Sequence, residues 1–336
     1  MPLSVVTMFR LESTLRNQIG WLFIVCPIAI LFLSSCRNEL PMESREFAYS
    51  SEAVGELRDQ LGPKSKVIGR IANGEKLLIL ERLNRWARVR VVSADAAEGQ
   101  PLVEGWMHQR QMVSQQVFEQ FQELAKQSAD LLSQGGALVR RLANMRLQPG
   151  RNTQAFYQLA TDEQVEVLRH SIKARPATAE EVRRGTTEPI PEDWLLVRAS
   201  KNRTGWILES LAEMVPPLEV ARYRESQRIR AWFKIFEERD EGQTRPWFLW
   251  ATVPKLTGAP HDFEEIRVFV WNPAADRYET SYRERNLVGF LPINVALTKT
   301  PTGDSPEFYF EHQNAEGERV RRTYFMLGRQ VRLKRD

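Results

Sequence analysis

The sequence contains an internal duplication, and this repeat limits the fold more than any other feature. Residues 56–80 and 144–168 align at a constant shift of 88 positions, which superposes Leu57 on Met145. Both segments alternate apolar and polar residues and carry a Gly/Pro turn dipeptide, as half-buried strands joined by tight turns do. A strand-rich unit that occurs twice in one chain predicts two small β-domains.

The duplication continues through two tryptophan-containing strands, with loops of different length between them. Residues 85–90 match residues 193–198, and in both the Trp and the Val fall on opposite faces of a strand. Gly105-Trp106-Met107 likewise matches Gly205-Trp206-Ile207. The second copy carries an insert near 171–192, which a surface loop tolerates.

Both copies resemble bacterial SH3-like (SH3b) domains, whose pattern is an apolar-Arg strand, Gly/Pro turns, a Trp-x-x-Val strand and a Gly-Trp strand. The match covers residues 46–114 and 139–215, although neither copy has the full Asn-Val-Arg signature and Asp162 stands where a turn glycine is usual. The resemblance implies small barrels that bind cell-wall peptides or protein partners in a shallow aromatic groove. The candidate groove residues are Tyr49, Trp86, Trp106, Tyr157, Trp194 and Trp206. The alternative is that these rings fill the barrel cores.

Residues 1–35 have the organisation of a lipoprotein signal peptide. Arg10 and Arg16 precede an apolar run over residues 19–33. This run has the length of a secretory signal and is shorter than the ~20 apolar residues that a spanning helix needs.

The apolar run ends in Leu33-Ser34-Ser35-Cys36. This tetrad resembles the bacterial lipobox, in which the signal is cut before the cysteine and its thiol is acylated. The resemblance implies a membrane anchor at Cys36, and Arg37 in place of Asp implies the outer membrane, with the protein facing the periplasm. A plain signal anchor with an incidental cysteine is the alternative.

A single helix is expected between the two copies. Residues 115–136 have an amphipathic pattern, Ser114 can cap the first turn, and Gly135-Gly136 can end the helix. We interpret this segment as a connector helix that packs across the first barrel and spaces the two copies.

Residues 219–336 form a further, β-rich domain for which the sequence suggests no family. Short strands separated by turn signals predict an antiparallel meander that closes into a barrel or folds into a sandwich. Many of its residues are aromatic, and Tyr309 alternates out of phase with Phe308 and Phe310, so some rings face away from the core. One interpretation is that these rings are core residues and ordinary surface aromatics. The other is that they line a groove for a partner or an acyl chain.

The end of the chain is basic at alternate positions. Its cationic residues are Arg319, Arg321, Arg322, Arg329, Arg332, Lys334 and Arg335. They form a solvated strand face, or they contact an anionic group such as a lipid head group or a wall-peptide carboxylate.

Composition and residue spacing argue against catalysis, metal binding and nucleic-acid binding. The balance of 47 Lys and Arg against 43 Asp and Glu gives only +4, and four scattered histidines with two cysteines offer no zinc cluster. Acylation of Cys36 would leave the mature chain without a free thiol, which excludes cysteine-peptidase chemistry. No serine-hydrolase or phosphate-loop motif occurs. We therefore expect a protein that is not an enzyme and has no cofactor.

The sequence thus predicts a mainly β fold, with two small SH3-like barrels joined by an α-helix and followed by an antiparallel β-meander barrel or sandwich. The expected function is that of a non-catalytic envelope lipoprotein that binds peptidoglycan through its tandem SH3-like domains. One alternative is a protein-interaction scaffold or adaptor in an envelope complex. A second is an envelope hydrolase with an unrecognised site in residues 219–336.

Overall fold

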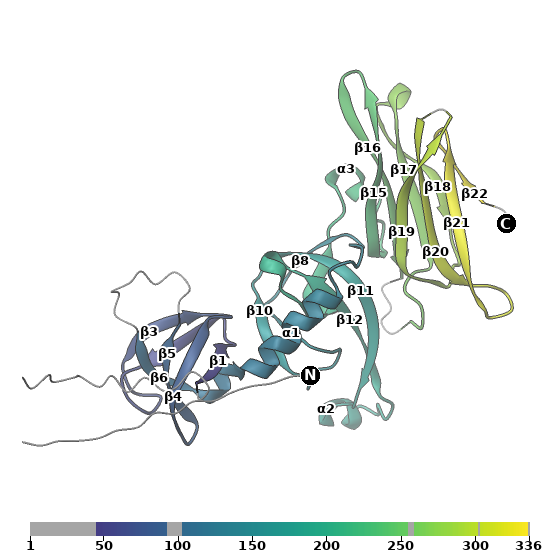
Figure 1. The fold of residues 1–336 in the computed structure, drawn as a ribbon. Helices are drawn as coiled ribbons and strands as arrows, with labels where there is room; N and C mark the ends of the chain where they lie inside the picture. Colours follow the sequence, from purple (N-terminus) through teal and green to yellow (C-terminus); the bar gives the residue numbers. More distant parts are fainter. Residues whose placement is uncertain (1–44, 93–102, 255–258, 302, 335–336) are drawn as a thin grey trace, which may run out of the picture. The chain divides into compact units, whose positions relative to one another are not determined.

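The computed structural model describes residues 45–92, 103–254, 259–301 and 303–334, so the predicted signal segment and Cys36 lie outside the described residues. The fold is mainly β, with four curled antiparallel sheets (Figure 1). This confirms the fold class expected from the sequence. None of the helices in these ranges combines the length and apolar character that a membrane-spanning helix needs.

Residues 46–114, drawn from purple to blue in Figure 1, form one seven-stranded sheet that we call repeat 1. Its strands are β1 (Glu46–Ser50), β2 (Val54–Arg58), β3 (Val67–Ala72), β4 (Lys76–Leu83), β5 (Trp86–Val91), β6 (Glu104–His108) and β7 (Met112–Ser114). Their order in the sheet is β3-β2-β6-β5-β4-β1-β7. A short 3₁₀ helix, η2 (Gln109–Gln111), joins the last two strands.

Residues 136–214 form a second seven-stranded sheet, which we call repeat 2. Its strands are β8 (Gly136–Val139), β9 (Ala143–Arg146), β10 (Ala155–Leu159), β11 (Gln164–Arg175), β12 (Ile190–Arg198), β13 (Thr204–Leu208) and β14 (Ala212–Met214). Their order, β10-β9-β13-β12-β11-β8-β14, corresponds strand for strand to that of repeat 1. Two 3₁₀ helices, η3 (Ser200–Asn202) and η4 (Glu209–Leu211), flank β13. The sequence duplication is therefore a duplication of topology.

The repeats also agree in the turn before their fourth strand. Gly74 has φ +85° and Asp162, at the matching position, has φ +64°. The N–H of Gly74 donates to the carbonyl of Ser50 over 2.8 Å, and the N–H of Asp162 donates to that of Val139 over 2.7 Å. Asp162 therefore adopts the left-handed conformation that glycine supplies in repeat 1, which aspartate tolerates better than most residues.

Helix α1 (Gln115–Gln127) follows repeat 1 directly. The Ser114 hydroxyl accepts a hydrogen bond from the N–H of Val117 and caps the first turn. The apolar side of the helix buries Phe121 and Ala125, and Phe121 belongs to the core of repeat 2. The helix is thus a structural part of repeat 2 as well as a connector.

The helix is shorter than the sequence predicted, because it ends at Gln127 and not near Gly136. The chain then pairs with β11: the N–H of Gln134 donates to the carbonyl of Val167 (2.7 Å), and the N–H of Val167 donates to the carbonyl of Gly135 (3.0 Å). The Gly-Gly pair therefore begins a strand and does not end the helix.

The insert in repeat 2 is an extension of the β11–β12 hairpin. The ladder runs from Arg169 opposite Leu196 to Arg175 opposite Ile190. Helix α2 (Ala179–Arg183) lies at its tip and begins with a capping box made by Thr178 and Glu181.

The C-terminal domain consists of two four-stranded meanders, each in chain order, preceded by helix α3 (Leu218–Ala221). The first contains β15 (Arg228–Asp240), β16 (Gln243–Val253), β17 (Glu265–Asn272) and β18 (Arg277–Glu284), with η5 (Pro273–Ala275) before β18. The second contains β19 (Gly289–Thr300), β20 (Gly303–Gln313), β21 (Arg319–Leu327) and β22 (Gln330–Leu333). They share one core, which includes Trp247, Phe263, Ile293, Phe308 and Tyr324.

Candidate functional site

Three of the six predicted groove residues, Trp86, Trp106 and Trp206, are only half-buried. Each alternates with buried residues on its strand, so the three rings lie on the outward faces of the repeats. The Trp86 ring packs edge-on against His108, with 5.2 Å between the ring centroids. These three residues remain candidates for ligand contact.

Trp106 and Trp206 stand in matching surroundings. Trp106 pairs across the sheet with Arg58, and Trp206 pairs with Arg146, which is the matching arginine of repeat 2. The inward glycines Gly105 and Gly205 allow this close approach, because a Cβ at either position would lie 3.0–3.2 Å from the arginine carbonyl oxygen.

The arginine of each pair is held by the following loop. The Arg58 guanidinium donates to the carbonyl of Ser65 over 2.6 Å, and the Arg146 guanidinium donates to the carbonyl of Thr153 over 2.5 Å. The hydroxyl of Ser65 or Thr153 in turn donates to the carbonyl of the loop glycine. The same arrangement of a tryptophan, its paired arginine and the following loop therefore occurs in both repeats. We call this arrangement the corner.

The other three predicted groove residues are buried, which corrects their assignment to an open groove. Tyr49 stacks on Phe118 of α1, with ring centroids 3.8 Å apart, and donates to Gln115. Tyr157 accepts a hydrogen bond from Gln122 of the same helix. Trp194 is 2% exposed, and its indole N–H has no acceptor among the described residues. These rings pack within the protein and are not open to a ligand.

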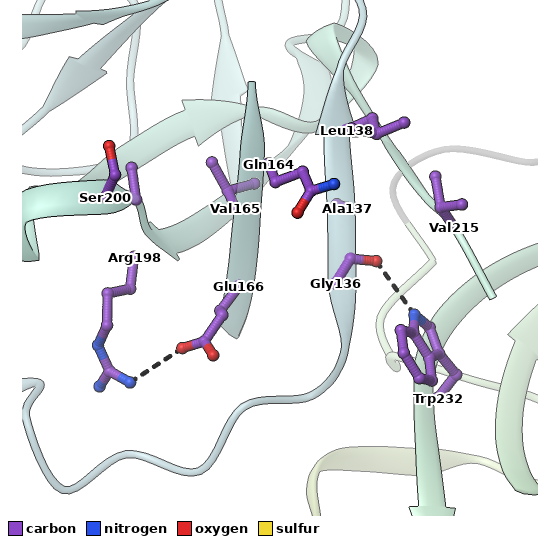
Figure 2. Close-up of a pocket in the computed structure, with 11 residues that line it drawn as sticks. Gly136, Ala137, Leu138, Gln164, Val165, Glu166, Arg198, Ser200, Val215 and Trp232 are labelled. Atoms are coloured by element: carbon purple, nitrogen blue, oxygen red, sulfur yellow. Dashed lines mark hydrogen bonds and ion pairs between the residues drawn. The ribbon is translucent and has the colours of Figure 1, made fainter. Parts of the chain in front are cut away.

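A pocket of about 580 Å³ lies over β8, β11 and β12 of repeat 2 (Figure 2). Its lining residues are Gly136, Ala137, Leu138, Gln164, Val165, Glu166, Arg198, Ala199, Ser200, Val215 and Trp232. Figure 2 shows the Arg198–Glu166 ion pair on one side of the pocket and Trp232 on the other. The lining is thus mixed, with an ion pair, an amide and a hydroxyl beside apolar side chains.

The residues at one edge of the pocket differ from those of repeat 1. Gly136 pairs with Glu166 in the β8–β11 ladder, and the matching β1–β4 pair in repeat 1 is Phe47 with Leu78. The ammonium of Lys76 lies 4.0 Å from the centroid of the Phe47 ring. Repeat 1 thus has a large side chain at the position where repeat 2 has a glycine of the pocket lining.

Polar contacts fix the walls of this pocket. Arg198 donates to the backbone carbonyls of Ser128 and Ala129 over 2.6 and 3.0 Å, and its other nitrogen lies 3.1 Å from Glu166. The indole N–H of Trp232 donates to the carbonyl of Gly136 over 3.0 Å. A pocket with such walls is preformed and suits a small polar organic group such as part of a peptide.

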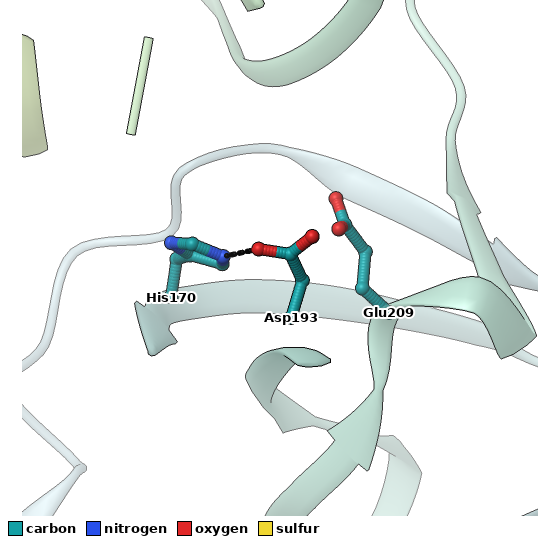
Figure 3. Close-up of side chains that lie close together, drawn as sticks. All are labelled: His170, Asp193 and Glu209. Carbon is teal, nitrogen blue, oxygen red and sulfur yellow. Dashed lines mark hydrogen bonds and ion pairs between the residues drawn. The ribbon is translucent and has the colours of Figure 1, made fainter. Parts of the chain in front are cut away.

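A second group of polar residues is buried between repeat 2 and the C-terminal domain (Figure 3). The His170 side chain, 1% exposed, has Nε2 2.9 Å from Asp193 and Nδ1 2.6 Å from Asp262. Arg230 is equally buried and bonds to Glu209, with its second nitrogen 3.4 Å from Asp193. We call these five residues, together with Arg228, the His170 cluster.

The protonation states of the cluster follow from these contacts. Burial lowers the pKa of His170, but hydrogen bonds to Asp193 and Asp262 outweigh it, so the pKa is raised above the ordinary 6.5. Burial likewise raises the pKa of Asp193, yet His170 and the charge of Arg230 lower it to about 2. The two hydrogen bonds therefore favour the protonated form of His170.

His170, Asp193 and Glu209 have ligand atoms within 4.8 Å of one another, which is close enough to share a cation. Arg230 already binds both Glu209 and Asp193, so a metal ion would have to displace a buried guanidinium. We therefore assign the cluster a structural role. The sequence did not indicate it, because its members come from separate segments and no local spacing links them.

Neither the family models nor the curated proteins compared with the chain give a match. Among solved structures, the chain is similar to an NlpC/P60 family protein from Bacillus cereus (TM-score 0.25, 11% identity), over 52% of this chain and 57% of that one. It thus spans little more than half of that protein. It is also similar to NlpC2 (TM-score 0.18, 9% identity, 73% and 99% of the two chains) and NlpC1 (0.17, 10%, 84% and 88%) from Trichomonas vaginalis. TM-scores this low carry no argument about fold or activity.

Proposed function

We propose that the chain is a non-catalytic binding protein of the bacterial cell envelope, in which two SH3-like repeats hold the peptide of the cell wall. The observation that carries this proposal is the corner built twice, with Trp106 beside Arg58 and Trp206 beside Arg146. A tryptophan that only fills a core is buried, whereas the indoles of Trp106 and Trp206 are partly exposed to solvent. Partly exposed tryptophans at matching surface positions are suited to ligand contact.

The two corners differ in one flanking residue. Arg88 lies opposite Trp106 in repeat 1, and Leu196 lies opposite Trp206 in repeat 2. Arg88 is half exposed and shares Glu104 with Arg90, so it can offer N–H donors to a ligand carboxylate. The corner of repeat 1 therefore offers a ligand carboxylate N–H donors that the corner of repeat 2 lacks, because Leu196 is buried. The pocket of Figure 2 lies nearby in repeat 2.

The proposed location is the outer membrane, facing the periplasm, with a lipid anchor at Cys36. The support is the tetrad Leu33-Ser34-Ser35-Cys36 at the end of an apolar run. Two or three acyl chains bind a bilayer stably, which would keep the repeats close to the wall. Mass spectrometry of the native protein tests the anchor, because an unmodified N-terminal segment that retains residues 1–35 would contradict it.

Co-sedimentation with purified sacculi tests the binding function. The wild-type mature protein should pellet with the sacculi, and the double variant Trp106→Ala/Trp206→Ala should stay in the supernatant. Phe325→Ala, which removes a half-buried ring from the C-terminal domain, is the matched control and should pellet like the wild type. Wild-type protein in the supernatant, or a double variant that pellets normally, would reject the proposal.

The hydrolase alternative makes a different prediction. This alternative places an unrecognised site in residues 219–336, and both cysteines, Cys26 and Cys36, lie far before that segment. A zymogram with sacculi in the gel should therefore remain blank. If the refolded wild-type protein produces a lytic band, the result would favour the hydrolase instead.

A further inference from the structure

The outward face of β19, β20 and β21 carries two arginines over two aromatic rings. Phe308 and Phe310 are buried on β20, so Tyr309 between them points outward. On β21, Arg319 and Arg321 alternate with the inward residues and are both exposed. We call Phe290, Tyr309, Arg319 and Arg321 the arginine–aromatic face.

Each guanidinium of this face is stacked on a ring. The Cζ atom of Arg319 lies 3.7 Å from the centroid of Phe290, and that of Arg321 lies 4.6 Å from the centroid of Tyr309. Phe290 is on β19, two strands away from Arg319, so the Arg319 side chain reaches across β20 to its ring. The two arginines are therefore held over the sheet and do not extend freely into solvent.

These two arginines differ from others of the basic tail in their partners. Arg322 pairs with Glu284, and Arg329 pairs with Glu238. Among the residues that the structure describes, Arg319 and Arg321 form no ion pair. A guanidinium stacked flat on a ring keeps the N–H donors along its edge, and those donors fit a carboxylate.

A shallow pocket of about 240 Å³ adjoins the stacked pairs. Phe290, Tyr309 and Arg321 line it, together with Leu291, Pro292, Phe310, Asn294 and Glu311. The face thus combines two cationic groups with a shallow hollow of mixed lining, which includes the Asn294 amide and the Glu311 carboxylate. An extended peptide could place carboxylates on the arginines and a small side chain in the hollow.

We propose that the arginine–aromatic face docks an extended acidic segment of a partner protein, with carboxylates at alternate positions. Arg319 and Arg321 are two residues apart on one strand, about 6.7 Å, which is also the spacing of alternate side chains in an extended peptide. Glu307 and Glu311 share this outward face with Arg332, and Lys334 lies 3.6 Å from Glu307, so acidic and basic groups are interspersed on it. Discrete carboxylates at a fixed spacing fit such a face better than the uniform negative charge of a membrane does. This inference concerns the C-terminal domain and is independent of wall binding by the repeats.

Fluorescence anisotropy with a labelled peptide of alternating Glu and Ala tests the proposal, with the Gln-Ala peptide as the uncharged control. The Glu peptide should bind the wild-type protein, and Arg319→Ala/Arg321→Ala should weaken binding about tenfold or more. Arg319→Lys/Arg321→Lys should weaken it as well, because lysine keeps the charge but loses the planar fork. Arg332→Ala removes an exposed arginine of β22 that donates to Gln330, and it should leave binding nearly unchanged.

Three results would overturn this assignment. The wild-type protein could fail to bind the Glu peptide, or Arg332→Ala could weaken binding as much as the double variant, which would indicate diffuse charge attraction. The third is binding to phosphatidylglycerol vesicles that depends on Arg319 and Arg321 while the peptide does not bind, which would identify a lipid surface. All three variants change exposed side chains, so circular dichroism should confirm that they fold.

Discussion

The Nδ1 atom of His170 lies 2.6 Å from Oδ1 of Asp262, and this contact joins β11 of repeat 2 to the segment between β16 and β17. The other ring nitrogen bonds to Asp193, so both nitrogens face carboxylates and both must donate. Asp262 also accepts a hydrogen bond from the N–H of Leu291 in β19 over 2.7 Å. A protonated histidine therefore fastens the C-terminal domain to repeat 2.

This contact predicts that stability depends on pH. The pKa of His170 is raised in the folded state, so the stabilisation is fully present below pH 6.5 and is lost as pH rises through the higher folded pKa. The melting temperature should therefore fall as the pH rises above 6.5 and through the raised pKa of His170. Thermal unfolding followed by circular dichroism at several pH values measures this.

The variant His170→Gln should lose this pH dependence and unfold with a free energy lower by about 3 kcal/mol near neutral pH, because buried carboxylates lose their cation. His108→Gln, at a partly exposed position of repeat 1, is the control and should keep the wild-type profile. A His170→Gln protein that retains the wild-type slope would show that other groups cause the pH dependence.

The duplication could be predicted from sequence, because strand alternation and turn residues are local signals. Trp106 and Trp206 occupy matching positions in the two repeats, but whether their rings face a groove or the core could not be read from the pattern. Trp86 and Trp194 match equally well in sequence, yet only Trp194 is buried. No local pattern distinguishes the two positions, because burial depends on the tertiary fold.

The end of α1 and the His170 cluster could not be predicted for the same reason. Residues 128–135 continue the helical pattern, but backbone pairing of Gln134 and Gly135 with Val167 of β11 takes precedence. His170 and Asp262 are 92 positions apart, and the sequence around each of them is that of an ordinary surface residue. Only the tertiary fold makes them a buried charged pair.

Gly135 should be far less tolerant of substitution than a loop glycine of similar conformation. It has φ +123°, and a Cβ there would lie 2.8 Å from the Trp232 ring and 2.9 Å from the Trp232 carbonyl oxygen. Gly62 has φ +108° and open space around it. Urea unfolding should show a loss of about 1 kcal/mol for Gly62→Ala and clearly more for Gly135→Ala. Equal losses would mean that the contact with Trp232 is unimportant.

Asp162 offers the opposite test, because it adopts a left-handed conformation in which repeat 1 has Gly74. Asp162→Gly should raise the free energy of unfolding by up to about 1 kcal/mol, since the strain of a side chain in this region is removed. Asp162→Val should lower it, because a β-branched residue fits this region worst. If the glycine variant is the less stable of the two, the turn does not have the conformation described.

We expect the two repeats to be two copies of one binding site. Isothermal titration of the mature protein with a soluble disaccharide-peptide fragment of peptidoglycan measures the number of sites. We predict two bound fragments per wild-type chain, one for Trp106→Ala, one for Trp206→Ala and none for the double variant. Absence of binding by the wild type, or a stoichiometry that neither substitution changes, would contradict it.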